Sequence, residues 1–181
     1  MSNYRRNRVP GGTYFFTVNL LNRQSGLLVK HIDELRAAVR QTKRLHPFHI
    51  DAWVVLPDHL HCVWTLPEND ADYSRRWQAI KKAFSKSIPP DEQRSKVQTQ
   101  RNERGIWQRR FWEHTITSDR DYAAHIDYIH FNPVKHGWAQ AVKDWPYSTF
   151  HQWVEQGVYP LGWAGCDESI ADAGESPSYS P

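Results

Sequence analysis

The sequence predicts one domain of the mixed α+β class. Strand-like and helix-like segments alternate along the chain, two apolar segments are joined by a tight turn, and a length of 181 residues suits a single domain. The local residue patterns support each expected element in turn.

The first strand and the first helix have clear patterns. Residues 13–20 are rich in β-branched and aromatic side chains and follow Gly11 and Gly12, so they predict a strand. Residues 32–45 carry apolar side chains at helical spacing with charges between them, and Pro47 ends this amphipathic helix.

Two further apolar segments predict a β-hairpin. Residues 48–56 and 59–66 each have the composition of a strand, and Pro57 and Asp58 make a tight connection between them. The second arm of this hairpin begins with two histidines.

The second half of the chain predicts helices separated by irregular and extended segments. A basic helix covers residues 72–87, and residues 91–104 have the composition of an exposed loop. The remaining expected elements are an extended segment at residues 106–116, a helix at 121–131 that Asn132 and Pro133 break, and a short helix at 145–155.

This order of elements, with a hairpin in its middle, favours an antiparallel or mixed sheet covered by helices over a doubly wound parallel sheet. We therefore expect a ferredoxin-like arrangement. The domain should occupy residues 1–165, and residues 166–181 form an acidic tail with the composition of a disordered end.

The charge distribution favours a nucleic-acid partner. Residues 75–110 hold eleven Lys or Arg against three acidic residues, with Trp77, Phe84 and Trp107 among them. Cations neutralise phosphates, and aromatic faces stack on unpaired bases. A solvated helix face with core aromatics between the charges is the alternative explanation.

The composition also argues against an exported or membrane-bound protein. Cys62 and Cys166 give neither a disulfide framework nor a C-x-x-C zinc spacing, and no run approaches the roughly 20 apolar residues of a membrane span. The N-terminal residues contain arginines and no apolar leader. We expect a cytoplasmic, nucleoid-associated protein that acts as a monomer, with a dimer as the alternative.

The sequence Leu-Pro-Asp-His-Leu-His-Cys at residues 56–62 suggests half of a metal site. In a strand, alternate side chains share a face, so His59 and His61 should lie side by side while Leu60 points the other way. Two neutral imidazoles can hold one divalent ion. An accidental pair is the alternative in a chain with ten histidines.

Tyr128 and Asn132 are the candidates for the rest of this site. They lie four residues apart on an expected helix, so a phenol and an amide oxygen project from the same face. If that helix packs across the histidine strand, His59, His61 and Asn132 form a three-ligand cup for Mg²⁺ or Mn²⁺ beside the Tyr128 hydroxyl. A core tyrosine and a helix-ending asparagine are the alternatives.

Several long motifs resemble one protein family. These are YRR at residues 4–6, GGTYFFTVNL at 11–20, WVVLPDHLHCVWTLP at 53–67, RFWEH at 110–114, DYIHFNPVKHGW at 127–138 and WPYSTFH at 145–151. Together they resemble the single-strand transposases that carry an HUH motif and one catalytic tyrosine, and closely the REP-associated tyrosine transposases of bacterial chromosomes.

The resemblance implies roles for the candidate residues. His59 and His61 would be the HUH histidines and Tyr128 the nucleophile, and Asn132 stands where related transposases often carry a glutamine ligand. Tyr128 would attack a phosphodiester in single-stranded DNA and form a 5′-phosphotyrosine link. A free tyrosine has a pKa of about 10 and needs assistance at neutral pH from the metal, a base or an electropositive site. His125 and His130 are candidate bases, and a surface or packing role is the alternative for each.

The resemblance also implies a substrate, the REP hairpin, which is a short palindrome folded from one DNA strand. Charge and composition indicate which residues contact it. The candidates are Tyr4, Arg5, Arg6, Arg75, Arg76, Lys81, Lys82, Trp107, Arg109, Arg110 and Trp112.

Two other functions fit parts of the sequence. One is a protein that binds REP hairpins without needing catalysis. The other is a zinc hydrolase that completes the histidine pair with His114 or His125, although no glutamate general base lies beside the pair.

Overall fold

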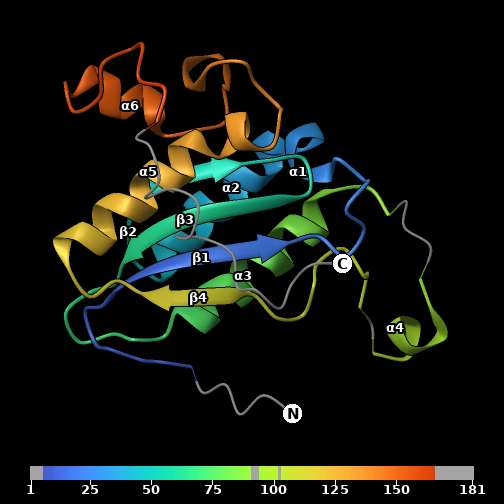
Figure 1. The fold of residues 1–181 in the computed structure, drawn as a ribbon. Coiled ribbons are helices and arrows are strands. Elements are labelled where there is room, and N and C mark those ends of the chain that lie inside the picture. The colour runs from blue at the N-terminus through green and yellow to red at the C-terminus, as the bar shows by residue number, and fades with distance from the viewer. Residues whose placement is uncertain (1–5, 91–93, 102, 166–181) are drawn as a thin grey trace.

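Four strands form one antiparallel sheet in the order β2-β3-β1-β4 (Figure 1). The computed structural model describes residues 6–90, 94–101 and 103–165. The strands are β1 (Thr13–Asn19), β2 (His49–Val55), β3 (His59–Thr65) and β4 (Trp112–Thr115). Because β3 lies between β1 and β2 and runs opposite to both, the topology is the split β-α-β of ferredoxin-like folds, as the sequence predicts.

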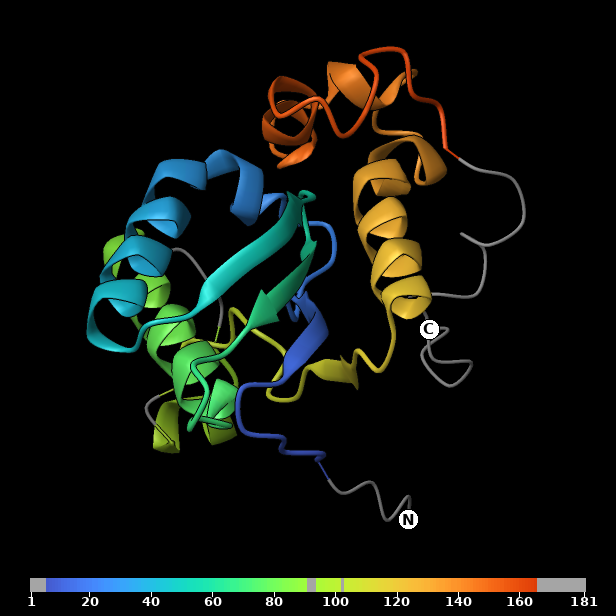
Figure 2. The same cartoon turned by 90° about the vertical axis from the view of Figure 1, so that its left-hand side faces the viewer.

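The helices cover both faces of this sheet. They are α1 (Leu27–Lys30), α2 (Ile32–Leu45), α3 (Tyr73–Ser87), α4 (Lys96–Gln100), α5 (Asp119–Lys135) and α6 (Phe150–Glu155), with a 3₁₀ turn η1 (Val142–Asp144). Figure 2 shows α2 and α3 on one face and α5 on the other. No helix among the described residues has both the length and the apolar character needed to cross a bilayer.

A hydrophobic core fills each side of the sheet. On the α2 and α3 side, the Trp64 and Trp77 rings stack with their centroids 4.3 Å apart. On the α5 side, Phe15 and Val63 pack with Ile129. Successive side chains of β3 point to opposite faces of the sheet and pack in different cores. The order of residues in the strand therefore determines which core each side chain joins.

Helix α5 continues past the position where the sequence predicts its end. It contains Pro133, whose missing N–H removes one backbone hydrogen bond, yet the helix extends to Lys135. Asn132 and Pro133 are both buried, and the His136 N–H donates to the Asn132 carbonyl at 3.1 Å. Packing of this face on the sheet therefore outweighs the local preference of proline to end a helix.

Two smaller predictions are also corrected. The expected loop at residues 91–104 contains α4, which starts with a capping box between Ser95 and Gln98. The last helix starts at Phe150, later than expected. The predicted acidic tail, residues 166–181, lies outside the described residues.

Residues 147–149 instead cover the outer edge of β2. The Val55 N–H donates to the Tyr147 carbonyl at 2.9 Å, and the Thr149 N–H donates to the Trp53 carbonyl at 2.9 Å. These bonds occupy backbone groups that a sheet edge otherwise exposes to other chains.

Candidate active site

The two histidines lie side by side on the face of β3 that α5 covers. His59 is 5% exposed and His61 is 2% exposed, and their ring centroids are 4.9 Å apart. Leu60 points to the opposite core, as the strand alternation predicts. The pair is therefore buried and held in place by the sheet.

Hydrogen bonds orient both rings in the same way. The His61 Nδ1 bonds to the Thr17 Oγ1 across the β1–β3 ladder at 2.9 Å, and the His59 Nδ1 bonds to the Asp58 Oδ1 at 2.7 Å. Arg23 forms an ion pair with the same carboxylate. Because Nδ1 is engaged in each ring, Nε2 is the nitrogen left for a cation.

The electrostatics of the pair suit metal binding. Burial lowers the pKa of His61 well below its ordinary value, and the nearby basic side chains, Lys135 and Arg23 among them, lower it further. Burial alone would raise the pKa of Asp58, but its bonds to His59 and Arg23 lower it to about 2. At neutral pH His61 is therefore neutral, and its buried Nε2 has no hydrogen-bond partner among the described residues.

Helix α5 brings Tyr128 and Asn132 to the histidines. The Tyr128 ring centroid is 5.2 Å from that of His61, and the His136 ring centroid is 5.4 Å from that of His59. Asn132 lies one helical turn from each of these residues, so it sits between them on the same face. It is fully buried, and its side-chain oxygen and nitrogen have no hydrogen-bond partner among the described residues. The structure thus brings together the four residues that the sequence predicts.

His136 and Lys135 are residues of this site that the sequence analysis missed. The Lys135 Nζ lies 4.8 Å from the centroid of the Tyr128 ring, which places a positive charge over the phenol. A spacing of four residues links Tyr128, Asn132 and His136. This spacing predicts that the three side chains share one face of a helix. Because the sequence predicts a helix break at Asn132, His136 was not expected on this helix face.

His130 does not join the site as a base. Its Nε2 bonds to the Thr149 Oγ1 at 3.1 Å, and its ring packs against Phe150 and Trp153. Burial lowers its pKa to about 3. It is a packing histidine, neutral at physiological pH.

His125 belongs to a separate cluster with His114 and Asp121, between β4 and the start of α5. The His114 Nε2 and the His125 Nδ1 lie 2.9 Å and 3.0 Å from the Asp121 carboxylate. Among the described residues these three side chains form the one group of three or more His, Cys, Asp and Glu residues that could hold a metal ion, and neither His59 nor His61 belongs to it. The cluster therefore does not complete the histidine pair, as a zinc hydrolase would require.

Comparison with known proteins decides the family. The sequence model of the family described as "Transposase IS200 like" matches residues 12–132, a span that contains His59, His61, Tyr128 and Asn132. The chain belongs to this transposase family. A REP-associated tyrosine transposase of Escherichia coli (strain K12) is 52% identical over 175 residues, which cover 97% of this chain and 98% of the relative.

A solved structure supports the same assignment. A REP-associated tyrosine transposase bound to a REP hairpin is similar with a TM-score of 0.82 and 51% identity, and the similarity covers 97% of this chain and 98% of that chain. The resemblance to the REP-associated tyrosine transposases and the ferredoxin-like α+β fold are thus both confirmed.

Several residues of this transposase that are predicted to contact DNA are exposed to solvent. Four cations are exposed: Arg75, Lys82, Arg109 and Arg110. Arg6 is also exposed, with its guanidinium 4.3 Å from the centroid of the Phe111 ring. Tyr4 and Arg5 lie outside the described residues.

Two aromatic residues that are predicted to stack on bases already pack against other side chains of the protein. Trp107 lies against Phe84, with its indole nitrogen buried, and Trp112 lies against Phe15. Both remain partly exposed, so stacking on bases remains a prediction for each.

Arg76 and Lys81 do not fit the prediction that they track phosphates. Arg76 is 2% exposed, and its Nη2 donates to the Pro47 carbonyl at 2.6 Å and to Asp70 at 2.8 Å. The Lys81 Nζ donates to the Gln108 carbonyl at 2.8 Å, and burial lowers its pKa to about 8. Both cations stabilise the fold, because each already donates to an acceptor within the protein, from which DNA would have to displace it.

We expect Arg76→Ala to lower the free energy of unfolding by about 2–4 kcal/mol, because Asp70 and the Pro47 carbonyl lose their donor. Arg75→Ala, at the exposed neighbouring position, should cost less than about 0.5 kcal/mol. Chemical denaturation followed by circular dichroism measures both. Equal and small effects of the two substitutions would contradict a structural role for Arg76.

Proposed function

We propose that this transposase cuts and rejoins single-stranded DNA at REP hairpins through a covalent bond to Tyr128. The observation that carries the proposal is the position of the Tyr128 ring against His61, on the side of α5 that faces the histidine pair. The hairpin enters the proposal because it is the DNA bound in the similar solved structure.

The residues present fit a divalent cation of the kind that the family implies. The neutral His61 has an unengaged Nε2, the Nδ1 of His59 is tied to Asp58, and the Asn132 amide is buried without a partner among the described residues. His59, His61 and Asn132 would hold Mg²⁺ or Mn²⁺. Such an ion polarises a phosphoryl oxygen and orients the displacement.

The chain's own residues supply the nucleophile and its surroundings. The Tyr128 oxygen forms a bond to phosphorus while the bond from phosphorus to the 3′ oxygen breaks, so the 5′ phosphate stays on the protein and the 3′ oxygen leaves as a hydroxyl. The phenol gives up its proton in the same step and the leaving 3′ oxygen takes up one proton, directly or through water, so no net proton is consumed. Lys135, over the Tyr128 ring, stabilises the negative charge that develops.

The product retains the energy of the broken bond. A 3′ hydroxyl that attacks the phosphotyrosine link rejoins DNA and regenerates the phenol, so no external energy source is needed. Enclosure of Tyr128 between Phe15 and the histidines keeps water from competing for the link.

End-labelled hairpin DNA tests the proposal and its polarity. With Mg²⁺ or Mn²⁺ present, a hairpin labelled at its 3′ end should give a protein–DNA adduct on a denaturing gel, whereas the same hairpin labelled at its 5′ end should release a free fragment. Mass spectrometry of the adduct should place the DNA on Tyr128. Hairpin binding without any adduct in either metal would favour the alternative, a REP-binding protein that needs no catalysis.

A further inference from the structure

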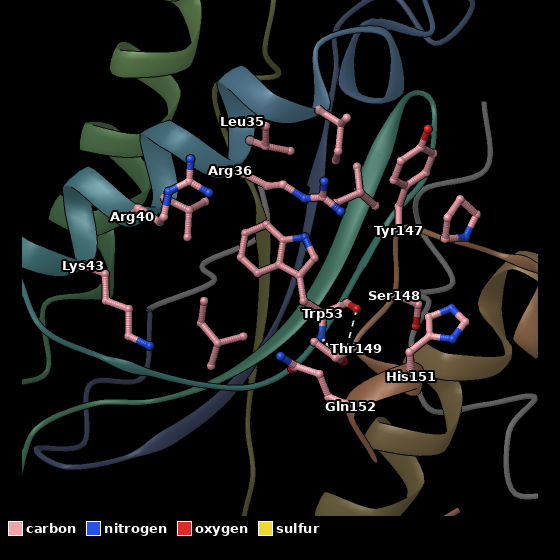
Figure 3. Close-up of a pocket in the computed structure, with 15 residues that line it drawn as sticks. Leu35, Arg36, Arg40, Lys43, Trp53, Tyr147, Ser148, Thr149, His151 and Gln152 are labelled. Carbon is pink, nitrogen blue, oxygen red and sulfur yellow. Dashed lines mark hydrogen bonds between the residues drawn. The ribbon is translucent and has the colours of Figure 1, made fainter. Parts of the chain in front are cut away.

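A groove of about 510 Å³ lies on the sheet face opposite the candidate active site. Exposed cations of α2 form one wall, β2 forms the floor, and residues 146–152 form the other wall (Figure 3). Val55 lines this groove and leads through the hairpin turn to His59. The groove runs along β2 from Ile50 to Val55, so its Val55 end lies at the same end of the hairpin as the histidine pair, on the opposite face.

The Lys and Arg side chains of the groove all lie on its α2 wall. Arg36, Arg40 and Lys43 recur at helical spacing along α2, with successive turns about 5.4 Å apart, and all three are exposed. None of the lining residues is Asp or Glu. Arg36 also pairs with Asp33 at 3.4 Å, but an exposed ion pair of this kind is weak and exchanges readily for a phosphate.

The groove also presents aromatic rings. Trp53 is partly exposed at its floor, and the stacked Trp64 ring, with its centroid 6.3 Å away, holds it from behind. Tyr147 stands on the far wall, with its ring centroid 6.0 Å from the Arg36 guanidinium. A row of cations beside fixed aromatic rings is the arrangement that binds unpaired nucleotides.

The backbone at this groove is not available to a peptide strand. Residues 147–149 already bond to the outer edge of β2. A partner must therefore be recognised by side chains, which excludes strand addition at this edge and favours a polyanion with flat bases.

We propose that this groove binds the single-stranded DNA that flanks the hairpin. The proposal rests on the proposed function, since it assigns a second contact to the same substrate. The α2 cations hold the phosphates of the flank, and Trp53 and Tyr147 stack on its bases.

Binding measurements use the Tyr128→Phe protein, which is expected not to cleave DNA, so that the groove is tested separately from catalysis. The groove variant is Arg40→Gln with Lys43→Gln, and the matched control is Arg120→Gln with Lys143→Gln, which removes two exposed cations elsewhere. The DNAs are a REP hairpin, the same hairpin with a flank of about ten nucleotides, and oligothymidine.

The groove variant should bind the flanked hairpin and oligothymidine about tenfold more weakly, with a salt slope that is shallower by about 1.4 for two lost phosphate contacts. The bare hairpin and the control variant should change less than about twofold. Photocrosslinking of iododeoxyuridine in the flank should label Trp53 or Tyr147.

Three results would overturn the proposal. The first is that the groove variant loses equal affinity for the bare and the flanked hairpin. The second is that the control variant binds the flanked hairpin as weakly as the groove variant does. The third is that the groove binds oligoglutamate but not oligothymidine. Absence of cleavage by the wild-type protein with flank binding intact would count against the proposed function alone, so the two failures are distinguishable.

Discussion

Tyr128→Phe is expected to abolish covalent attachment to DNA and to slow strand cleavage by at least about 1,000-fold, which corresponds to about 4 kcal/mol of transition-state stabilisation. The substitution removes one oxygen atom and keeps the ring that packs edge-on against Phe15. The protein should therefore fold normally and bind the hairpin with an affinity within about twofold of wild type. Denaturing gels and thermal unfolding measure the two properties.

Tyr122→Phe is the matched control for this experiment. Tyr122 lies on the same helix, and its hydroxyl donates to Asp51 at 3.1 Å, away from the histidines. Adduct formation should survive its loss. An adduct that persists in Tyr128→Phe, or disappears only in Tyr122→Phe, would show that the nucleophile has been assigned to the wrong tyrosine.

His61→Ala is expected to lower metal-dependent cleavage by at least about 100-fold at every metal concentration, because it deletes a proposed ligand from the cup. Thr17→Val keeps the ligand but removes the hydroxyl that orients it at 2.9 Å. This variant should need about 10–100-fold more Mn²⁺ for half-maximal cleavage and should recover at saturation.

The contrast between these two variants is the informative measurement. Titration of cleavage rate against Mn²⁺ separates a lost ligand from a misoriented one. If His61→Ala recovers at high Mn²⁺, or if Thr17→Val matches the wild-type titration, the histidine does not bind the metal through the oriented Nε2.

The sequence predicts those parts of the structure that local patterns control. The strand alternation at residues 59–66 correctly places His59 and His61 on one face, because a period of two leaves no other choice. The α2 helix has the expected bounds, since its apolar spacing and Pro47 agree.

Tertiary contacts explain the features that the sequence predicted wrongly. Pro133 favours a helix end locally, but the buried face of α5 holds the helix together and adds His136 to the site. The pattern around Arg76 resembles an exposed basic helix, and only the meeting of α3 with the Pro47 turn and Asp70 reveals that this cation is buried. Such contacts join residues that no local pattern links.

The passage of α5 through Pro133 has a mechanical consequence. Tyr128 and Asn132 lie on one helix and His136 caps its C-terminal end, so the packing of α5 on the sheet fixes all three positions relative to the histidine strand. A displacement of α5 along its axis by one turn, about 5.4 Å, would withdraw nucleophile and metal-site partners together. A change in the packing of this single helix would therefore alter the positions of the nucleophile and of the proposed ligand Asn132 at once.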